Sequence, residues 1–172
     1  IEYNCYINSS GYSNAAKNYI KILNNLKYNV IVKPLNQQFI DNRSELDREV
    51  ASIIEKNKNK TIKPHIQIIH AVPPVGVKES NRYKGVPRIW FYAWEGKYLP
   101  EEMITAFQPM EHLVTFSNDQ IDVYKNDLKK DNITYIPHIV LGKERYAKND
   151  ITKQEKNKTF TFLSVFEWNA RK

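Results

Sequence analysis

The sequence has little cysteine, glycine and arginine, and it lacks long apolar runs. Cys5 is the only cysteine in 172 residues, which excludes a disulfide framework and a four-cysteine zinc site. The five glycines form neither G-x-G-x-x-G nor a P-loop, two common phosphate-binding fingerprints. No run reaches the ~20 apolar residues of a membrane span, and no signal-peptide pattern is present. These absences predict a cytoplasmic domain.

Positive charge exceeds negative charge by 26 to 19, but the excess is almost entirely lysine, with 20 lysines against 6 arginines. Lysine, asparagine, isoleucine and tyrosine together account for 68 residues, and all four are encoded by AT-rich codons. The lysines are scattered and form no stripe of the kind that binds nucleic acid. We therefore expect no nucleic-acid partner, while an anionic partner such as phosphates, or a peripheral membrane contact, stays open.

Strand-like and helix-like segments alternate along the chain. Strands are expected within residues 3–7, 28–32, 66–70, 87–94, 112–116 and 133–136, and helices over 14–27, 44–57 and 100–107 and behind a capping box at 117–120. This alternation predicts an α/β, Rossmann-like, doubly wound parallel sheet over residues 1–141. Residues 142–158 are polar and lysine-rich and indicate a linker, and residues 159–166 indicate one further strand.

Ligands of open α/β sheets bind beyond the carboxyl ends of the strands. The loop after the first expected strand carries Gly11, Tyr12, Ser13 and Asn14 to the start of a helix. Backbone N–H groups at such a helix start favour anions, and a glycine lets the backbone approach a ligand closely. The alternative interpretation is a plain strand-to-helix turn capped by Ser13.

Other candidate residues follow the third and fourth expected strands. His70 ends an apolar run, where an imidazole can bind a hydroxyl or transfer protons; the alternative is a structural histidine. Glu95 stands beside Trp94 and could bind sugar hydroxyls or act as a base, or could be an exposed turn residue. The four histidines lack metal-ligand spacing, so no metal site is expected, and Cys5 is expected to be buried.

The order of these features resembles a known family. The Gly11 loop opens a long helix, Trp94 and Glu95 are followed by Leu99 and Pro100, and residues 114–117 precede another helix. Residues 135–137 and 160–172 complete the pattern. Each motif is weak alone, but over essentially the whole chain they resemble the N-terminal half of GT-B glycosyltransferases, close to the retaining glycosyltransferase group 1 (family 4-like) enzymes.

The resemblance implies two Rossmann-like domains that face each other across a cleft. Residues 1–141 would be the acceptor-side domain, and residues 159–172 the first strand of an absent, donor-binding C-terminal domain. The implied activity transfers a sugar from a nucleotide-sugar to a glycan, lipid or protein acceptor, without a metal or other cofactor. The isolated chain is therefore expected to be inactive, and a non-catalytic Rossmann-like binding module is the alternative.

The resemblance also assigns roles to residues. The family often has a histidine at the end of the fourth strand, where this chain has Trp94 and Glu95, so Glu95 is the first catalytic candidate and His70 the second. The candidates for binding donor phosphates are Gly11, Tyr12, Ser13, Arg171 and Lys172. The candidates for binding the acceptor are Asn14, Trp94, Ser117, Asn118 and His138.

Overall fold

The computed structural model describes residues 1–139 except residues 9, 36–44, 61–62 and 81. The expected linker, the strand at 159–166 and the candidates Arg171 and Lys172 lie outside the described residues. In the described part, no helix is long and apolar enough to cross a membrane.

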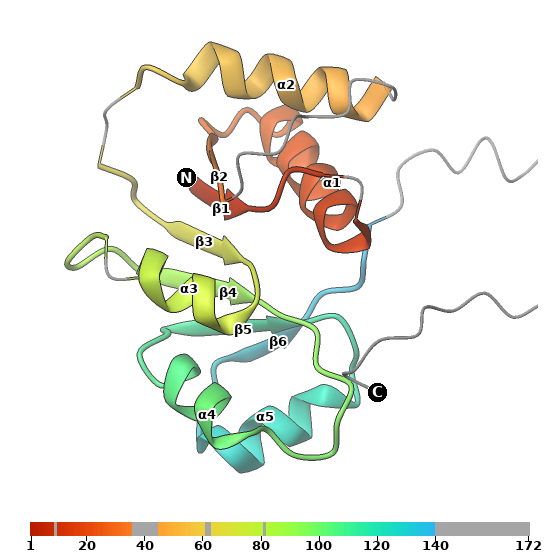
Figure 1. Ribbon diagram of the computed structural model, residues 1–172, viewed down its shortest axis with the longest axis vertical. Coiled ribbons are helices and arrows are strands. Elements are labelled where there is room, and N and C mark those ends of the chain that lie inside the picture. The colour runs from red at the N-terminus through yellow and green to blue at the C-terminus, as the bar shows by residue number, and fades with distance from the viewer. Residues whose placement is uncertain (9, 36–44, 61–62, 81, 140–172) are drawn as a thin grey trace, which may run out of the picture. The chain divides into compact units, whose positions relative to one another are not determined.

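The described strands form one six-stranded, all-parallel sheet in the order β2-β1-β3-β4-β5-β6 (Figure 1). The chain passes from β1 to β2 on one side and then returns past β1 to β3 on the other, so the strand order reverses between β1 and β3. This confirms the predicted doubly wound sheet. The strands are β1 (Glu2–Cys5), β2 (Ile31–Pro34), β3 (Gln67–His70), β4 (Arg88–Phe91), β5 (His112–Thr115) and β6 (Ile133–Tyr135).

Side chains of successive strand residues point to opposite faces of the sheet. Helices cover both of these faces. Tyr3, Ile68 and Phe91 pack with helices α1 and α2, whereas Ile69 and Trp90 belong to the core on the other face, with α4 and α5. Cys5 is buried on the first of these faces, as expected. The helices are α1 (Gly11–Asn25), α2 (Glu45–Asn57), α3 (Pro73–Ser80), α4 (Glu101–Phe107) and α5 (Gln120–Leu128).

Helix α3 is not among the helices expected from the sequence. A proline suits the first turn of a helix, where its missing N–H needs no partner, and α3 begins at Pro73. The helix packs closely on the sheet: a Cβ on Gly76 would lie 2.0 Å from the Trp90 ring. Only glycine therefore fits at this position of α3.

The predicted capping box of α5 is wrong. The helix begins at Gln120, and Asp119 occupies the N-cap position without a side-chain hydrogen bond. The Gln120 N–H bonds the backbone oxygen of Ser117, so a tight turn made by the main chain starts the helix. Tyr124 and Leu128 of this helix are buried.

Polar side chains lie buried where β1 and β3 face α3. Glu2 is 2% exposed and accepts hydrogen bonds from Tyr83 Oη at 2.7 Å, Asn4 Nδ2 at 3.2 Å and Gln67 Nε2 at 3.3 Å. Arg82 lies 3.7 Å from the same carboxylate and supplies the opposite charge that a buried acid requires. The strands in the centre of this sheet are thus not uniformly apolar.

Candidate active site at the carboxyl edge of the sheet

The reversal of strand order places β1 beside β3, and Cys5 pairs with His70 at the carboxyl ends of the two strands. This is the position at which open α/β sheets bind ligands. Two of the predicted site segments meet here, the β1–α1 loop and the end of β3.

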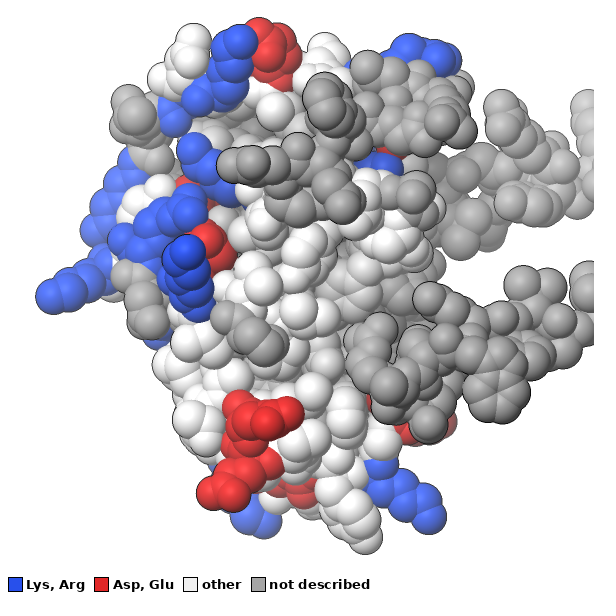
Figure 2. Space-filling model, viewed as in Figure 1, with Lys and Arg blue, Asp and Glu red and all other residues white. Residues whose placement is uncertain are grey.

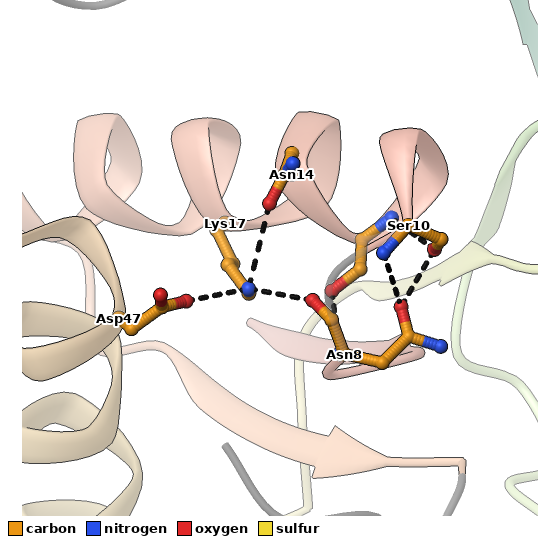
Figure 3. A network of polar contacts seen from close by, with 6 residues as sticks. Asn8, Ser10, Asn14, Lys17 and Asp47 are labelled. Carbon is orange, nitrogen blue, oxygen red and sulfur yellow. Dashed lines mark hydrogen bonds and ion pairs between the residues drawn. The ribbon is translucent and has the colours of Figure 1, made fainter. Parts of the chain in front are cut away.

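The β1–α1 loop is held by its own side chains (Figure 3). Asn8 Oδ1 accepts hydrogen bonds from the Ser10 amide at 2.9 Å and the Ser10 hydroxyl at 2.6 Å. Ser10 Oγ accepts from the Ser13 amide at 3.3 Å, so Ser10 caps α1, and the alternative of a Ser13 cap is wrong. Ser13 is buried, and its hydroxyl oxygen accepts from the Asn8 amide at 2.9 Å.

Lys17 of α1 connects this loop to α2 through its buried ammonium group. Its side chain is 1% exposed, and Nζ donates to the Asn8 carbonyl at 2.7 Å and to Asp47 Oδ1 of α2 at 2.5 Å (Figure 3). A third, longer contact of 3.5 Å joins Nζ to Asn14 Oδ1. A buried ammonium needs such partners. Sequence reasoning missed Lys17, since nothing in the pattern distinguishes it from Lys21 one turn on.

At the start of α1, the groups that could bind a phosphate are backbone amides. Gly11 is exposed and has open space where a Cβ would be. The Ser13 amide is occupied by Ser10, and the Asn14 amide makes the first bond to the Ser10 carbonyl. The amides of Gly11 and Tyr12 have no acceptor within the helix, as is general for a first turn. Gly11 and Tyr12 therefore remain the predicted phosphate-binding residues, whereas Ser13 stabilises the β1–α1 loop.

His70 is completely buried at this edge. Its Nδ1 lies 3.0 Å from the Tyr3 hydroxyl, and its Nε2 has no hydrogen-bond partner among the described residues. Burial lowers the pKa of His70 to about 3, with a smaller contribution from His138. Burial also raises the pKa of Tyr3, so that hydroxyl keeps its proton. With Tyr3 as donor to Nδ1, the neutral ring carries its proton on Nε2.

Aromatic rings surround His70. Its ring centroid lies 4.9 Å from that of Tyr12 in an edge-on orientation, and 5.4 Å and 5.5 Å from those of Phe91 and Phe116 in stacked orientations. His138 stacks on Phe116 with a 3.9 Å separation. The structure thus brings three predicted site residues, Tyr12, His70 and His138, into one cluster. Phe116 joins them, and sequence reasoning missed it.

The segment after β6 closes this cluster. Tyr19 of α1 donates to the Pro137 carbonyl at 2.7 Å, and Asn18 Nδ2 donates to the Ile139 carbonyl at 2.7 Å. His138 is an exposed residue, but the partial desolvation of its ring against Phe116 lowers its pKa. Local sequence patterns do not predict these contacts, because they join residues more than 100 positions apart.

The other predicted residues lie in the loops after β4 and β5, except Asn14, which lies in the first turn of α1. Trp94 is half-buried and donates through Nε1 to the Tyr98 carbonyl at 2.9 Å, and its ring packs on Gly96. Glu95, Ser117, Asn118 and Asn14 are exposed. Within the described residues, no ring contact or hydrogen bond joins these side chains to His70, so their roles stay predictions.

The chemistry available here is hydrogen bonding by neutral groups. A histidine with a pKa of about 3 is uncharged at neutral pH and is a weak base, but its Nε2–H can donate to a ligand oxygen. Among the described residues, no group of three or more histidine, cysteine, aspartate or glutamate side chains could hold a metal ion.

Comparisons with known proteins add no assignment. No family model, no curated protein and no solved structure matches this chain. What bears on function is therefore the fold, the geometry of the carboxyl edge and the order of sequence motifs.

Proposed function

We propose that residues 1–141 are the acceptor-side domain of a retaining GT-B glycosyltransferase, which transfers a sugar from a nucleotide-sugar donor to an acceptor. One observation carries the proposal: a buried His70, whose Nε2 has no hydrogen-bond partner among the described residues, lies at the strand-order reversal, in ring contact with Tyr12 at the start of α1. The resemblance in motif order supports it. The donor-binding half would come from a second domain.

In this proposal each group has a limited task. The Nε2–H of His70 donates to a hydroxyl of the bound sugar or acceptor once Phe116 and His138 move aside. The amides of Gly11 and Tyr12 stabilise the negative charge that develops on the departing diphosphate. Glu95 contacts the acceptor hydroxyl as hydrogen-bond acceptor or base. Closure of a second domain over this edge excludes water.

The test is the release of nucleoside diphosphate by the full-length gene product, with a panel of nucleotide-sugars. Glu95→Gln and His70→Phe should each lower kcat/KM at least about 100-fold, the usual scale for acid–base and hydrogen-bonding groups. Glu102→Gln, an exposed charge on α4, is the matched control and should leave turnover unchanged. Unchanged turnover in Glu95→Gln would remove that residue from the mechanism.

The complete burial of His70 also favours a second candidate, a Rossmann-like binding module without catalysis. Such a module would release no nucleoside diphosphate from any nucleotide-sugar, even as the full-length product. Calorimetry separates the two further. In the first proposal residues 1–172 alone bind nucleotide-sugar weakly or not at all, because the donor half is absent.

A further inference from the structure

A pocket of about 300 Å³ lies at the opposite edge of the sheet, where the strands begin. It is formed where α1 and α2 end, by the turn that follows α1 and the first residues after α2. Its volume is at the lower end of the range for small-molecule sites. The lining residues are Asn24, Lys27, Tyr28, Asn29, Lys56, Asn57 and Lys60.

The pocket is strongly cationic. Three lysines line it and no acidic residue does. The C-terminal ends of α1 and α2 each contribute a partial charge of about −0.5, which leaves a net charge of about +2. Figure 2 shows that lysine and arginine side chains gather on the side of the molecule where the strands begin. An anion is the complementary ligand.

Lysines near helix C-termini often serve as caps, so this simpler explanation must be tested. At the end of α1, the amides of Leu26, Lys27 and Tyr28 bond the carbonyls of Ile22, Asn24 and Leu23, and Lys27 adopts φ 68° to make this turn. The last carbonyls are thus satisfied by main-chain amides. The Lys27 side chain is therefore not required to cap α1.

Lys130, by comparison, is a lysine whose side chain does cap the end of a helix. Its Nζ donates to the carbonyls of Phe107 at 3.3 Å and Met110 at 2.9 Å after α4, and burial lowers its pKa. By contrast, Lys27 and Lys56 make no ion pair within the described residues, and Lys60 Nζ bonds only the Asn29 side chain, at 3.2 Å.

Asn57 gives the pocket a second feature. Its side chain is nearly buried, at 5% exposure of the residue, and Nδ2 donates to the Val30 carbonyl at 2.8 Å. This bond fixes the amide, so Oδ1 is an acceptor, and it has no hydrogen-bond partner among the described residues. A buried acceptor without a donor is unfavourable by about 1–3 kcal/mol. Oδ1 is covered in the structure, so a ligand hydroxyl would reach it only after neighbouring side chains move, and would then relieve this penalty.

We propose that this pocket binds a small phosphorylated polyol. The phosphate contacts Lys27, Lys56 and Lys60, and a neighbouring hydroxyl donates to Asn57 Oδ1. Lysine suits a phosphate as a compact, mobile charge with three donors. The site lies at the edge opposite His70 and does not depend on the function proposed above.

Calorimetry on the 172-residue chain tests the proposal, with glycerol 3-phosphate, inorganic phosphate and glycerol as probes at equal ionic strength. Glycerol 3-phosphate should bind at least about fivefold more tightly than inorganic phosphate, and glycerol should not bind. The triple variant Lys27→Gln/Lys56→Gln/Lys60→Gln should weaken the binding of glycerol 3-phosphate at least about tenfold, because it removes three charge-assisted hydrogen bonds to the phosphate.

The matched control is Lys97→Gln/Lys125→Gln/Lys129→Gln, which removes the same charge from exposed lysines outside the pocket and should retain binding. Equal loss in both triple variants would overturn the site in favour of general electrostatic attraction. Equal affinity for inorganic phosphate and glycerol 3-phosphate would overturn the role of Asn57. Binding to phosphatidic acid vesicles without binding to glycerol 3-phosphate would overturn a soluble ligand.

Discussion

The two edges of the sheet differ in the burial and pairing of their ionisable groups. At the carboxyl edge, His70 is buried among aromatic rings and is neutral, and Lys17 is buried against a carboxylate and a carbonyl. At the amino edge, three lysines line an open pocket without an acidic partner in its lining. Burial selects neutral or paired groups, whereas exposure tolerates unpaired charge. The contrast concerns the pocket beside α1 and α2, since Glu2 at the start of β1 is also buried and paired.

This comparison predicts where substitutions affect stability. Groups at the carboxyl edge bond across long sequence distances, so removing one leaves buried partners unsatisfied. Groups at the amino edge pocket are hydrated, so removing one changes the free energy of unfolding little. The following experiments test the comparison from the largest expected effect to the smallest.

Lys17→Met should lower the free energy of unfolding by about 3 kcal/mol, because it leaves the Asp47 carboxylate, 10% exposed, facing an apolar side chain. Lys21→Met is the matched control. Lys21 pairs with Glu49 between the same two helices at 2.5 Å, but the side chains are 28% and 38% exposed. That loss should not exceed about 1 kcal/mol. Urea unfolding measures both, and equal losses would contradict the difference in burial.

The contrast between Lys17 and Lys21 also shows what the sequence could not predict. Both lie on α1 four residues apart, and only the three-dimensional positions of Asn8 and Asp47 make one of them structural. The sheet was predictable because strand-like and helix-like segments alternate along the chain, and His70 was predictable because it ends one of the strand-like runs. The aromatic cluster and the amino edge pocket were not, since they join segments that local patterns do not relate.

Acid should destabilise the carboxyl edge through His70. Its pKa is about 3 in the folded protein and near 6.5 in the unfolded chain, so protons bind the unfolded chain more tightly. The stability contributed by the neutral ring is complete above pH ~6.5 and falls by about 1.4 kcal/mol per pH unit down to about pH 3. This slope refers to one group, and carboxylates add their own at lower pH.

His70→Phe separates the histidine from those carboxylates. Between pH 7 and pH 5 the wild-type protein should lose about 2 kcal/mol more than this variant does, which follows from the same slope over the 1.5 units below pH 6.5. Urea unfolding at four pH values gives both curves. Parallel curves would show that the ring titrates alike in the folded and unfolded states, as it would if water reached it.

Phe116→Leu should open the aromatic cluster partly and raise the pKa of His70, because burial is the largest cause of its depression. NMR titration of the ring protons should move the midpoint upward by about one unit. Phe107→Leu is the control, because Phe107 packs on Trp90 at the other face and should leave His70 unchanged. An unmoved midpoint in Phe116→Leu would mean that Phe116 does not shield the ring.

The smallest effect is expected at the amino edge. Lys27→Gln/Lys56→Gln/Lys60→Gln should change the free energy of unfolding by less than about 0.5 kcal/mol, because the lysine side chains neither cap a helix nor form ion pairs within the described residues. Their mutual repulsion is screened by salt, so raising NaCl from 0.01 to 0.5 M should stabilise the wild-type chain slightly more than this variant. Loss of more than about 2 kcal/mol would show that these lysines are structural, and the two edges would then differ only in exposure.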